Sequence, residues 1–300
     1  MRRACSKPSR RHSRSCEASV ISADTRPTEA GGELKAADGT RLAWRSWRPE
    51  HPRLVLAVIH GHGEHGGRYA GLAASMAEHG IATYAMDVRG HGASGGQRGH
   101  VMSWDQLIED GSSFVGAVRA EVGETEVVPL GHSVGGSILL SAVVRGVARP
   151  RRFVVSSPAL RVKAAVPGWK LTMGNVASKV LPTLALATEL DASHISRDPA
   201  VVRAYTDDPQ VHDKMSARFY TEWQAANREI LARAAEIKIP FLATHGSDDR
   251  IIDPAATDEL FRRASVEGRK LIIYPGAYHE PYNDLGREQV FADLATWLGA

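Results

Sequence analysis

Two kinds of hydrophobic pattern alternate along the chain from about residue 34. Short runs rich in apolar and β-branched side chains predict buried strands at residues 42–47, 54–59, 81–86, 126–130, 153–156, 240–245 and 270–274. Stretches with apolar side chains three and four positions apart predict helices around residues 69–77, 103–121, 138–143, 216–237 and 290–298, and another after Asp253. This alternation predicts an α/β fold with a mostly parallel central sheet and helices on both faces.

The alternation stops between residues 160 and 237. This stretch contains no run that predicts a strand before the long helical pattern at 216–237. It is interrupted by Pro167, Pro182, Pro199 and Pro209. We interpret residues 160–237 as a helical lid inserted between two strands of the sheet. Residues 31–159 and 238–300 are then expected to form the core domain.

The first 30 residues differ in composition from the rest. Residues 1–28 hold seven Lys and Arg against two acidic side chains, a formal charge of +5, whereas the whole chain carries +3. The remainder is therefore slightly acidic, which argues against nucleic acid as a partner. The segment has no apolar stretch typical of a signal peptide, and charged, Ser-rich ends are typical of disorder. We expect residues 1–30 to form a disordered basic tail.

Cysteine content and hydropathy limit the kinds of protein that this chain could be. Cys5 and Cys16 are the two cysteines and both lie in the tail, so the folded part offers neither a disulfide framework nor a cysteine metal site. No apolar run approaches the roughly 18 residues that a membrane-spanning helix requires. We therefore expect a cytoplasmic protein. Peripheral membrane association and the oligomeric state stay open.

Residues 127–136, Val-Val-Pro-Leu-Gly-His-Ser-Val-Gly-Gly, combine a strand, a G-x-S-x-G turn and the start of a helix. That order is typical of a nucleophile elbow, in which a serine projects from a sharp turn. Gly131 and Gly135 leave room for the turn, and the helix N-terminus below Ser133 can stabilise an oxyanion. The pattern therefore predicts that Ser133 is a nucleophile.

Two later strands end in residues that could activate a serine. The strand at 240–245 runs into Gly-Ser-Asp-Asp-Arg250, which offers Asp248 or Asp249, and the last strand runs into a loop ending at His279. A serine nucleophile needs a histidine to take its proton and a carboxylate to orient that histidine. Because parallel strands end at one edge of the sheet, these groups are expected to meet near Ser133. The spacing alone does not choose between the two aspartates.

The loop His60-Gly-His-Gly-Glu-His-Gly-Gly67 follows the buried strand at 54–59. In a hydrolase such a loop supplies an oxyanion N–H, so we expect the N–H groups of His62 and Val134 to form the oxyanion hole. The same residues also suggest a zinc hydrolase, because His60, His62, Glu64 and His65 imitate an H-x-H-x-D-H ligand set. That alternative leaves the nucleophile elbow unexplained, and we expect no metal.

Five motifs together resemble the monoacylglycerol lipase and lysophospholipase branch of the α/β-hydrolase superfamily. The resemblance covers about residues 34–298, all but the tail. It rests on His60-Gly-His-Gly-Glu-His-Gly-Gly-Arg-Tyr69, Asp87-Val-Arg-Gly-His-Gly-Ala-Ser94, Gly131-His-Ser-Val-Gly135, Gly246-Ser-Asp-Asp-Arg250 and Gly276-Ala-Tyr-His279, with a lid-like stretch at residues 196–209. The order serine, aspartate, histidine also matches this superfamily.

The resemblance implies a serine carboxylic-ester hydrolase without a cofactor, which cleaves monoacylglycerols to glycerol and fatty acid. Lysophospholipase or general carboxylesterase activity is the alternative. The family pattern implies that Asp249, which directly precedes a basic residue, is the catalytic acid. It also implies that Glu64, Arg68 and Tyr205 line a polar pocket for the glycerol end of the substrate. A structural ion pair explains Glu64 and Arg68 equally well.

The expected lid has a high apolar content. Its apolar side chains are Val166, Trp169, Leu171, Val176, Val180, Leu181, Leu184 and Leu186. Such side chains could pack against the core, or they could form an acyl channel and contact a membrane surface transiently. The sequence leaves both interpretations open.

Overall fold

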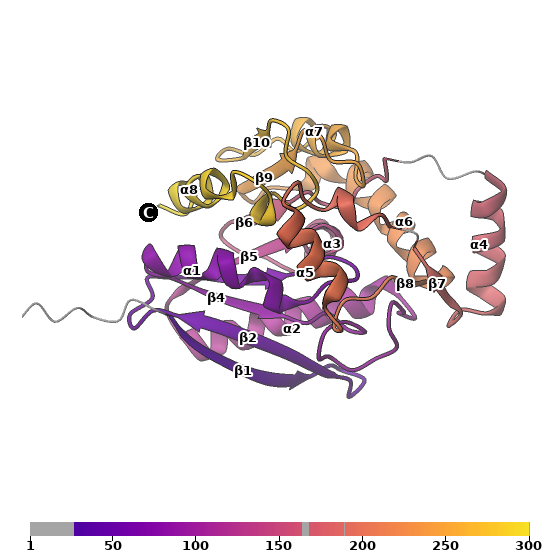
Figure 1. The fold of residues 1–300 in the computed structure, drawn as a ribbon, viewed down its shortest axis with the longest axis horizontal. Helices are drawn as coiled ribbons and strands as arrows, with labels where there is room; N and C mark the ends of the chain where they lie inside the picture. The colour runs from indigo at the N-terminus through magenta and orange to yellow at the C-terminus, as the bar shows by residue number, and fades with distance from the viewer. Residues whose placement is uncertain (1–26, 164–167, 189, 300) are drawn as a thin grey trace, which may run out of the picture.

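The computed structural model describes residues 27–163, 168–188 and 190–299. Eight strands form one sheet in the order β1-β2-β4-β3-β5-β6-β9-β10 (Figure 1). They are β1 (Thr28–Lys35), β2 (Arg41–Arg48), β3 (Leu54–Ile59), β4 (Ile81–Met86), β5 (Glu126–His132), β6 (Phe153–Ser156), β9 (Phe241–Gly246) and β10 (Lys270–Tyr274). Pairing is antiparallel at β1–β2 and β2–β4 and parallel from β4 to β10. The α/β-hydrolase fold with its mostly parallel sheet is confirmed.

Strand β1 shows where the expected boundary of the tail was wrong. It begins at Thr28 and pairs with β2, so residues 28–30 belong to the sheet; residues 1–26 lie outside the described part of the chain. Most side chains of β1 are exposed, because this strand lies at the edge of the sheet. Its sequence, Thr-Glu-Ala-Gly-Gly-Glu-Leu-Lys, therefore lacks the apolar run on which the strand predictions depended.

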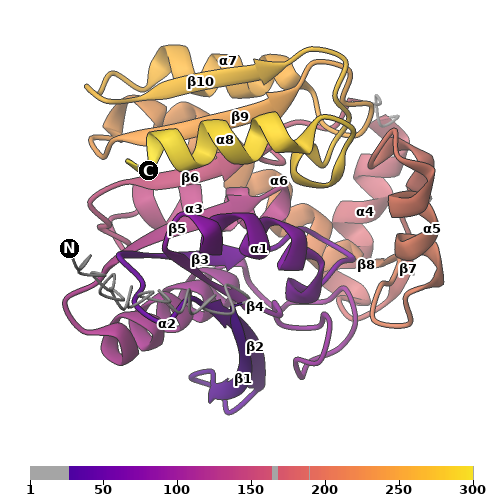
Figure 2. The ribbon, with the colours of Figure 1, turned by 60° about the vertical axis from the view of Figure 1, so that its left-hand side comes forward.

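Helices cover both faces of the sheet, and strand β3 shows why its sequence is apolar throughout. Val55, Ala57 and Ile59 point into the core on one face, and the alternate residues Leu54, Leu56 and Val58 into the core on the other. Helices α1 (Ala70–Glu78) and α8 (Arg287–Trp297) cover the second face (Figure 2). Helices α2 (Trp104–Val122), α3 (Val134–Val144) and α7 (Pro254–Arg263) cover the first.

Residues 160–237 lie between the neighbouring strands β6 and β9. This segment, called the lid after its expected role, contains α4 (Gly168–Val180), β7 (Ala185–Ala187), α5 (Pro199–Asp207), β8 (Lys214–Ser216) and α6 (Ala217–Ala232), with 3-10 turns at Ala192–His194 and Ala234–Glu236. The expectation that this segment contains no strand before residue 217 was wrong, because β7 and β8 form a short antiparallel pair. Three residues per strand are too few for a recognisable period. Helix α6 also packs against α3, and its Phe219 and Trp223 belong to the main core.

Much of the apolar content of the lid faces solvent. The exposed fractions are 58% for Val176, 70% for Val180, 55% for Leu181, 47% for Leu184 and 65% for Leu186. These five side chains therefore do not pack against the core. Val166 and the side chains of Trp169 and Leu171 lie outside the described part of the structure. No helix among the described residues is both long and apolar enough to cross a membrane.

Candidate active site

Ser133 lies at the sharp turn between β5 and α3. Its backbone has φ 52° and ψ −119°, a left-handed conformation that is strained for a residue with a side chain. Glycine is required on both sides, because a Cβ on Gly131 would overlap the backbone of Gly135, and a Cβ on Gly135 would overlap the carbonyl groups of Ile59 and His60. The turn places the Ser133 side chain above the N-terminus of α3, as the G-x-S-x-G pattern predicts.

Three side chains from three strand ends form one hydrogen-bonded chain. His279 Nε2 lies 2.9 Å from Ser133 Oγ, and His279 Nδ1 lies 2.7 Å from Asp249 Oδ2. All three residues are buried, with Ser133 8% and Asp249 1% exposed. Asp248 instead is exposed and accepts a hydrogen bond from Ser247. The structure therefore brings Asp249, and not Asp248, to His279.

The Asp249 carboxylate has further donors that the sequence did not reveal. His245 Nε2 donates to the same Oδ2 at 2.9 Å, and the N–H groups of Ile251 and Ile252 donate to Oδ1 at 2.8 and 2.9 Å. Burial opposes ionisation of Asp249, but His279 and His245 hold its pKa well below the ordinary value. Asp249 is therefore a carboxylate at neutral pH. His245 lies only four residues before it, at the end of β9, which is the signal that could have revealed the contact.

The charge on Asp249 acts on His279. Burial favours the neutral imidazole, but the nearby Asp249 carboxylate favours the imidazolium more strongly and raises the pKa of His279 above its ordinary value. A raised pKa suits a histidine that must take a proton and hold it briefly. The contacts and charges of this chain can thus activate the Ser133 hydroxyl.

The expected oxyanion residues lie at the same place. His62 and Val134 both line the cavity that contains Ser133 and His279. Val134 is the first residue of α3, so its N–H has no acceptor within the helix. Close approach is built into the loop before His62, since a Cβ on Gly61 would lie 2.9 Å from Ser133 Cβ. Glu64 fixes this loop by accepting the Gly61 N–H at 2.7 Å.

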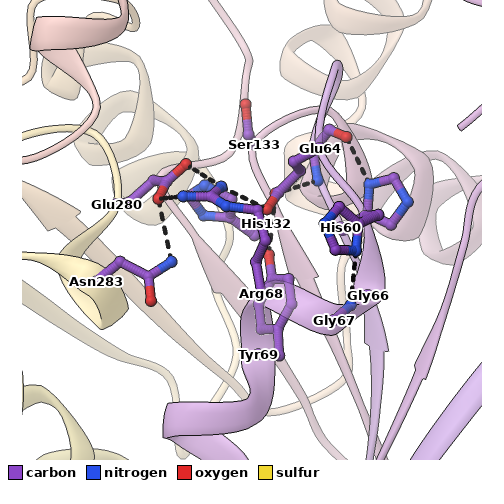
Figure 3. A network of polar contacts seen from close by, with 12 residues as sticks. His60, Glu64, Gly66, Gly67, Arg68, Tyr69, His132, Ser133, Glu280 and Asn283 are labelled. Carbon is purple, nitrogen blue, oxygen red and sulfur yellow. Dashed lines mark hydrogen bonds and ion pairs between the residues drawn. The ribbon is translucent and has the colours of Figure 1, made fainter. Parts of the chain in front are cut away.

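Glu64 and Arg68 belong to a buried ion cluster beside Ser133. Arg68 lies between Glu64 and Glu280 and bonds to Glu64 at 2.9 Å and to both Glu280 oxygens at 2.6 Å (Figure 3). Tyr69 donates to Glu64 at 3.2 Å, and Tyr205 from the lid stacks on the guanidinium, 4.8 Å away. Burial alone would raise the pKa of Glu64, but Arg68 and nearby histidines lower it to about 2.

This cluster shows how the substrate-pocket residues implied by the family resemblance are placed. Glu64 and Tyr205 line the cavity, whereas Arg68 lies behind them, engaged with two carboxylates. The structural ion pair considered for Glu64 and Arg68 is therefore present. Its third member, Glu280, was not foreseen from the sequence, although it directly follows His279.

The cavity above Ser133 has a volume of about 480 Å³, within the range typical of small-molecule sites. Much of its wall is apolar and comes from both core and lid: Ala159, Val162, Leu190, Ile195, Met215, Tyr220, Trp223, Ile251 and Ile252. The lining also includes the polar side chains of Glu64, Asp191, His194, Arg250 and Glu280. The cavity therefore offers apolar surface to an acyl chain and polar groups to hydroxyl groups.

The alternative zinc set does not assemble. His60 contacts the carbonyl of Gly61 and accepts the N–H of Val88, and Glu64 binds Arg68. His65 pairs with Asp208 of the lid at 2.8 Å. The side chains of the H-x-H-x-E-H pattern are thus directed to separate partners. His62 alone joins a group of histidines, with His91 and His212.

A mostly parallel sheet, a nucleophile elbow after β5 and a Ser-His-Asp chain of contacts define the class of α/β hydrolases. The chain belongs to the family described as Serine aminopeptidase, S33, whose model matches residues 50–286. It is 34% identical to a monoacylglycerol lipase of Mycolicibacterium smegmatis, over 90% of this chain and 97% of that protein. It is 30% identical to the monoglyceride lipase of Homo sapiens, over 88% of this chain and 89% of that protein.

Solved structures agree with the fold. A monoacylglycerol lipase from Paleococcus ferrophilus is similar with a TM-score of 0.76 and 28% identity, and the match covers 90% of this chain and 98% of that one. A soluble variant of the monoglyceride lipase from Saccharomyces cerevisiae, in complex with a substrate analogue, has a TM-score of 0.80 at 21% identity, over 91% of this chain and 95% of that one. The latter likeness concerns the fold.

Proposed function

We propose that this chain is a serine carboxylic-ester hydrolase that cleaves monoacylglycerols to glycerol and free fatty acid through an acyl-enzyme. The observation that carries the proposal is the contact chain Ser133–His279–Asp249, which opens on a largely apolar cavity. The named relatives support the substrate class, because lipases of monoacylglycerols match most of this chain at 30% and 34% identity. No cofactor takes part in this proposal.

The first half of the reaction forms the acyl-enzyme. His279 Nε2 takes the proton of Ser133 Oγ, which attacks the ester carbonyl, and the carbonyl electrons move onto oxygen. The N–H groups of His62 and Val134 hold that oxyanion. Asp249 stabilises the imidazolium. Collapse of the intermediate breaks the ester C–O bond, and the imidazolium gives its proton to the departing glycerol oxygen.

The second half returns the serine. A water molecule enters, His279 takes its proton, and the resulting hydroxide attacks the acyl carbon. A second oxyanion forms at the same N–H pair and collapses with cleavage of the bond to Ser133 Oγ, which regains the proton from His279. The fatty acid leaves. The first and the last proton transfers cross the 2.9 Å contact between Ser133 Oγ and His279 Nε2.

The lid supplies the proposed substrate specificity. Residues 160–237 are proposed to act as a lid over a core of residues 28–159 and 238–300, with Leu190, Ile195 and Met215 among the lid residues at the acyl chain. Glu64 and Tyr205 would face the glycerol hydroxyl groups, with Arg68 holding Glu64 in place. The exposed Val180 and Leu186 would touch the lipid surface from which the substrate is taken.

A substrate panel tests the proposal. Purified protein is assayed on monoacylglycerols of medium and long chain, lysophospholipids, triacylglycerols and soluble nitrophenyl esters, with Ser133→Ala run beside the wild type. We expect the highest kcat/KM for monoacylglycerols and loss of activity on every ester in Ser133→Ala. Better hydrolysis of lysophospholipids would make the chain a lysophospholipase, and activity confined to short soluble esters would make it a general carboxylesterase.

A further inference from the structure

Three histidines from three separate segments meet where the lid joins the core. His62 lies in the loop after β3, His91 in the loop after β4, and His212 in the lid between α5 and β8. One ring nitrogen of each lies within 4.8 Å of a ring nitrogen of the other two. The ring centroids are 5.1 Å apart for His62 and His91 and 4.5 Å apart for His91 and His212.

Each ring donates one N–H to a backbone carbonyl. His62 Nε2 lies 2.9 Å from the carbonyl of Lys214, and His91 Nδ1 lies 2.9 Å from that of Arg89. His212 Nε2 lies 3.1 Å from the carbonyl of Gly90. A carbonyl only accepts, so these nitrogens carry the protons, and the opposite nitrogen of each neutral ring carries a lone pair. This outer hydrogen bond is typical of histidines that bind metal ions.

The remaining nitrogens are poorly satisfied. His62 Nδ1 and His91 Nε2 are buried without a hydrogen-bond partner among the described residues, and His91 is only 1% exposed. His212 Nδ1 accepts one long bond of 3.2 Å from the N–H of Lys214. A buried acceptor without a donor costs about 1–3 kcal/mol. A ligand that accepts lone pairs would satisfy both of these acceptors.

We propose that His62, His91 and His212 bind a divalent transition-metal ion, with Zn²⁺ as the ion of choice, and that the bound ion inhibits hydrolysis. Imidazole suits zinc, and three histidines with one open position form a familiar tetrahedral set. In that geometry neighbouring nitrogens stand about 3.4 Å apart, so nitrogens now up to 4.8 Å apart draw together on binding.

The inhibitory effect follows from where the three residues lie. His62 carries the N–H proposed for the oxyanion hole, so movement of its side chain toward the ion shifts that donor away from the acyl carbonyl. His212 belongs to the lid and the other two ligands to the core, so the ion also ties the lid to the core. This part of the inference rests on the proposed function, whereas metal binding itself does not.

Binding is tested without any assay of activity. The full-length protein is freed of metal with a chelator, dialysed, and titrated with Zn²⁺ by calorimetry; Co²⁺ serves as a coloured probe of tetrahedral coordination. We expect one Zn²⁺ per chain. Loss of a residue that only hydrogen-bonds to a metal ligand typically weakens metal binding about 10- to 100-fold, and His212→Gln, which removes a ligand, should weaken zinc binding by more than that. His91→Gln is a second variant. His51→Gln is the control, because that side chain is 91% exposed and does not belong to the three-histidine group.

Cys5 and Cys16 are the two residues of the sequence that could bind zinc as thiolates, so the double variant Cys5→Ser with Cys16→Ser is tested as well. Binding that persists in this double variant and is lost in His212→Gln supports the site. Absence of binding in the wild type, or loss of binding in the thiol variant alone, overturns it.

Inhibition is measured separately, with each variant compared with its own metal-free rate. We expect Zn²⁺ to slow ester hydrolysis by the wild type at least 10-fold, with recovery on adding chelator, and to have no effect on His212→Gln at the same concentration. Zinc that binds stoichiometrically without slowing hydrolysis would overturn the inhibitory role and leave the site. A protein without esterase activity would contradict the proposed function and leave the calorimetric result intact.

Discussion

The ion cluster around Arg68 gives the sharpest quantitative prediction. Arg68→Met removes the one cation between Glu64 and Glu280, while keeping an apolar side chain of similar length to fill the space. The side chains are 10% exposed for Arg68, 4% for Glu64 and 6% for Glu280. Two carboxylates would therefore remain buried beside each other without their partner, at the loop that holds His62.

The expected cost follows from that burial. Removing one partner of a buried ion pair typically destabilises a protein by about 3–5 kcal/mol. At about 2–4 °C per kcal/mol for a domain of this order of size, the melting temperature should fall by about 10 °C. Hydrolysis should also slow, because Glu64 accepts the Gly61 N–H next to Ser133.

Thermal unfolding followed by circular dichroism provides the assay. Arg262→Met is the matched control, because its 2.8 Å pair with Asp258 is exposed and should contribute about 0–1 kcal/mol. A triple variant that adds Glu64→Gln and Glu280→Gln should regain part of the lost stability, since no uncompensated charge remains. A melting temperature of Arg68→Met within 2 °C of the wild type would refute the reasoning.

The pH dependence of the stability tests the same role of Arg68 independently. In the wild type the pKa of Glu64 is lowered from 4.5 to about 2, so this carboxylate contributes stability above pH 4.5 that is lost as the pH falls toward 2. In Arg68→Met the largest influence that opposes burial is gone, and the pKa of Glu64 should rise above its ordinary value. The variant then gains stability by protonation, so its difference from the wild type should be smaller at pH 5 than at pH 8.

Three further predictions concern the active site and the lid. Asp249→Asn should lower kcat about 10⁴-fold because His279 loses its orienting carboxylate. Asp248→Asn changes an exposed residue and should leave kcat near the wild-type value. Equal losses of kcat in the two variants, measured in steady-state assays, would contradict this. When kcat/KM is plotted against pH, the acid limb should have its midpoint above pH 6.5, because catalysis needs neutral His279 and the pKa of His279 is raised. A midpoint below pH 6.5 would argue against His279 as the base. Val180→Glu and Leu186→Glu should slow hydrolysis of monoacylglycerol in vesicles while sparing a soluble ester, and equal rates on vesicles would exclude lipid contact by these side chains.

The site residues that could be predicted from the sequence share one property. Ser133, Asp249 and His279 each lie in the turn or loop after a parallel strand, and topology brings the ends of such strands together. Buried parallel strands also carry a strong apolar signal, which is why most of the sheet was found. The G-x-S-x-G turn adds a backbone requirement that glycine alone satisfies.

The rest depends on contacts without a sequence period. The edge strand β1 is too polar to stand out, and β7 and β8 are too short. Glu280 reaches Arg68 across 212 positions, and His212 reaches the core loops through the fold of the lid. Spacing along the chain carries no information about such pairs. The alternative zinc set His60-x-His62-x-Glu64-His65 does not assemble for the same reason, because neighbours in sequence point to different partners.

Trapping of the acyl-enzyme tests the central claim most directly. Wild-type protein is mixed with a medium-chain monoacylglycerol, quenched in acid within milliseconds to seconds, digested and examined by mass spectrometry. The mechanism predicts an acyl group on Ser133, absent in Ser133→Ala and accumulating with burst kinetics if deacylation is slow. An acyl group on another residue, or undiminished hydrolysis by Ser133→Ala, would contradict it.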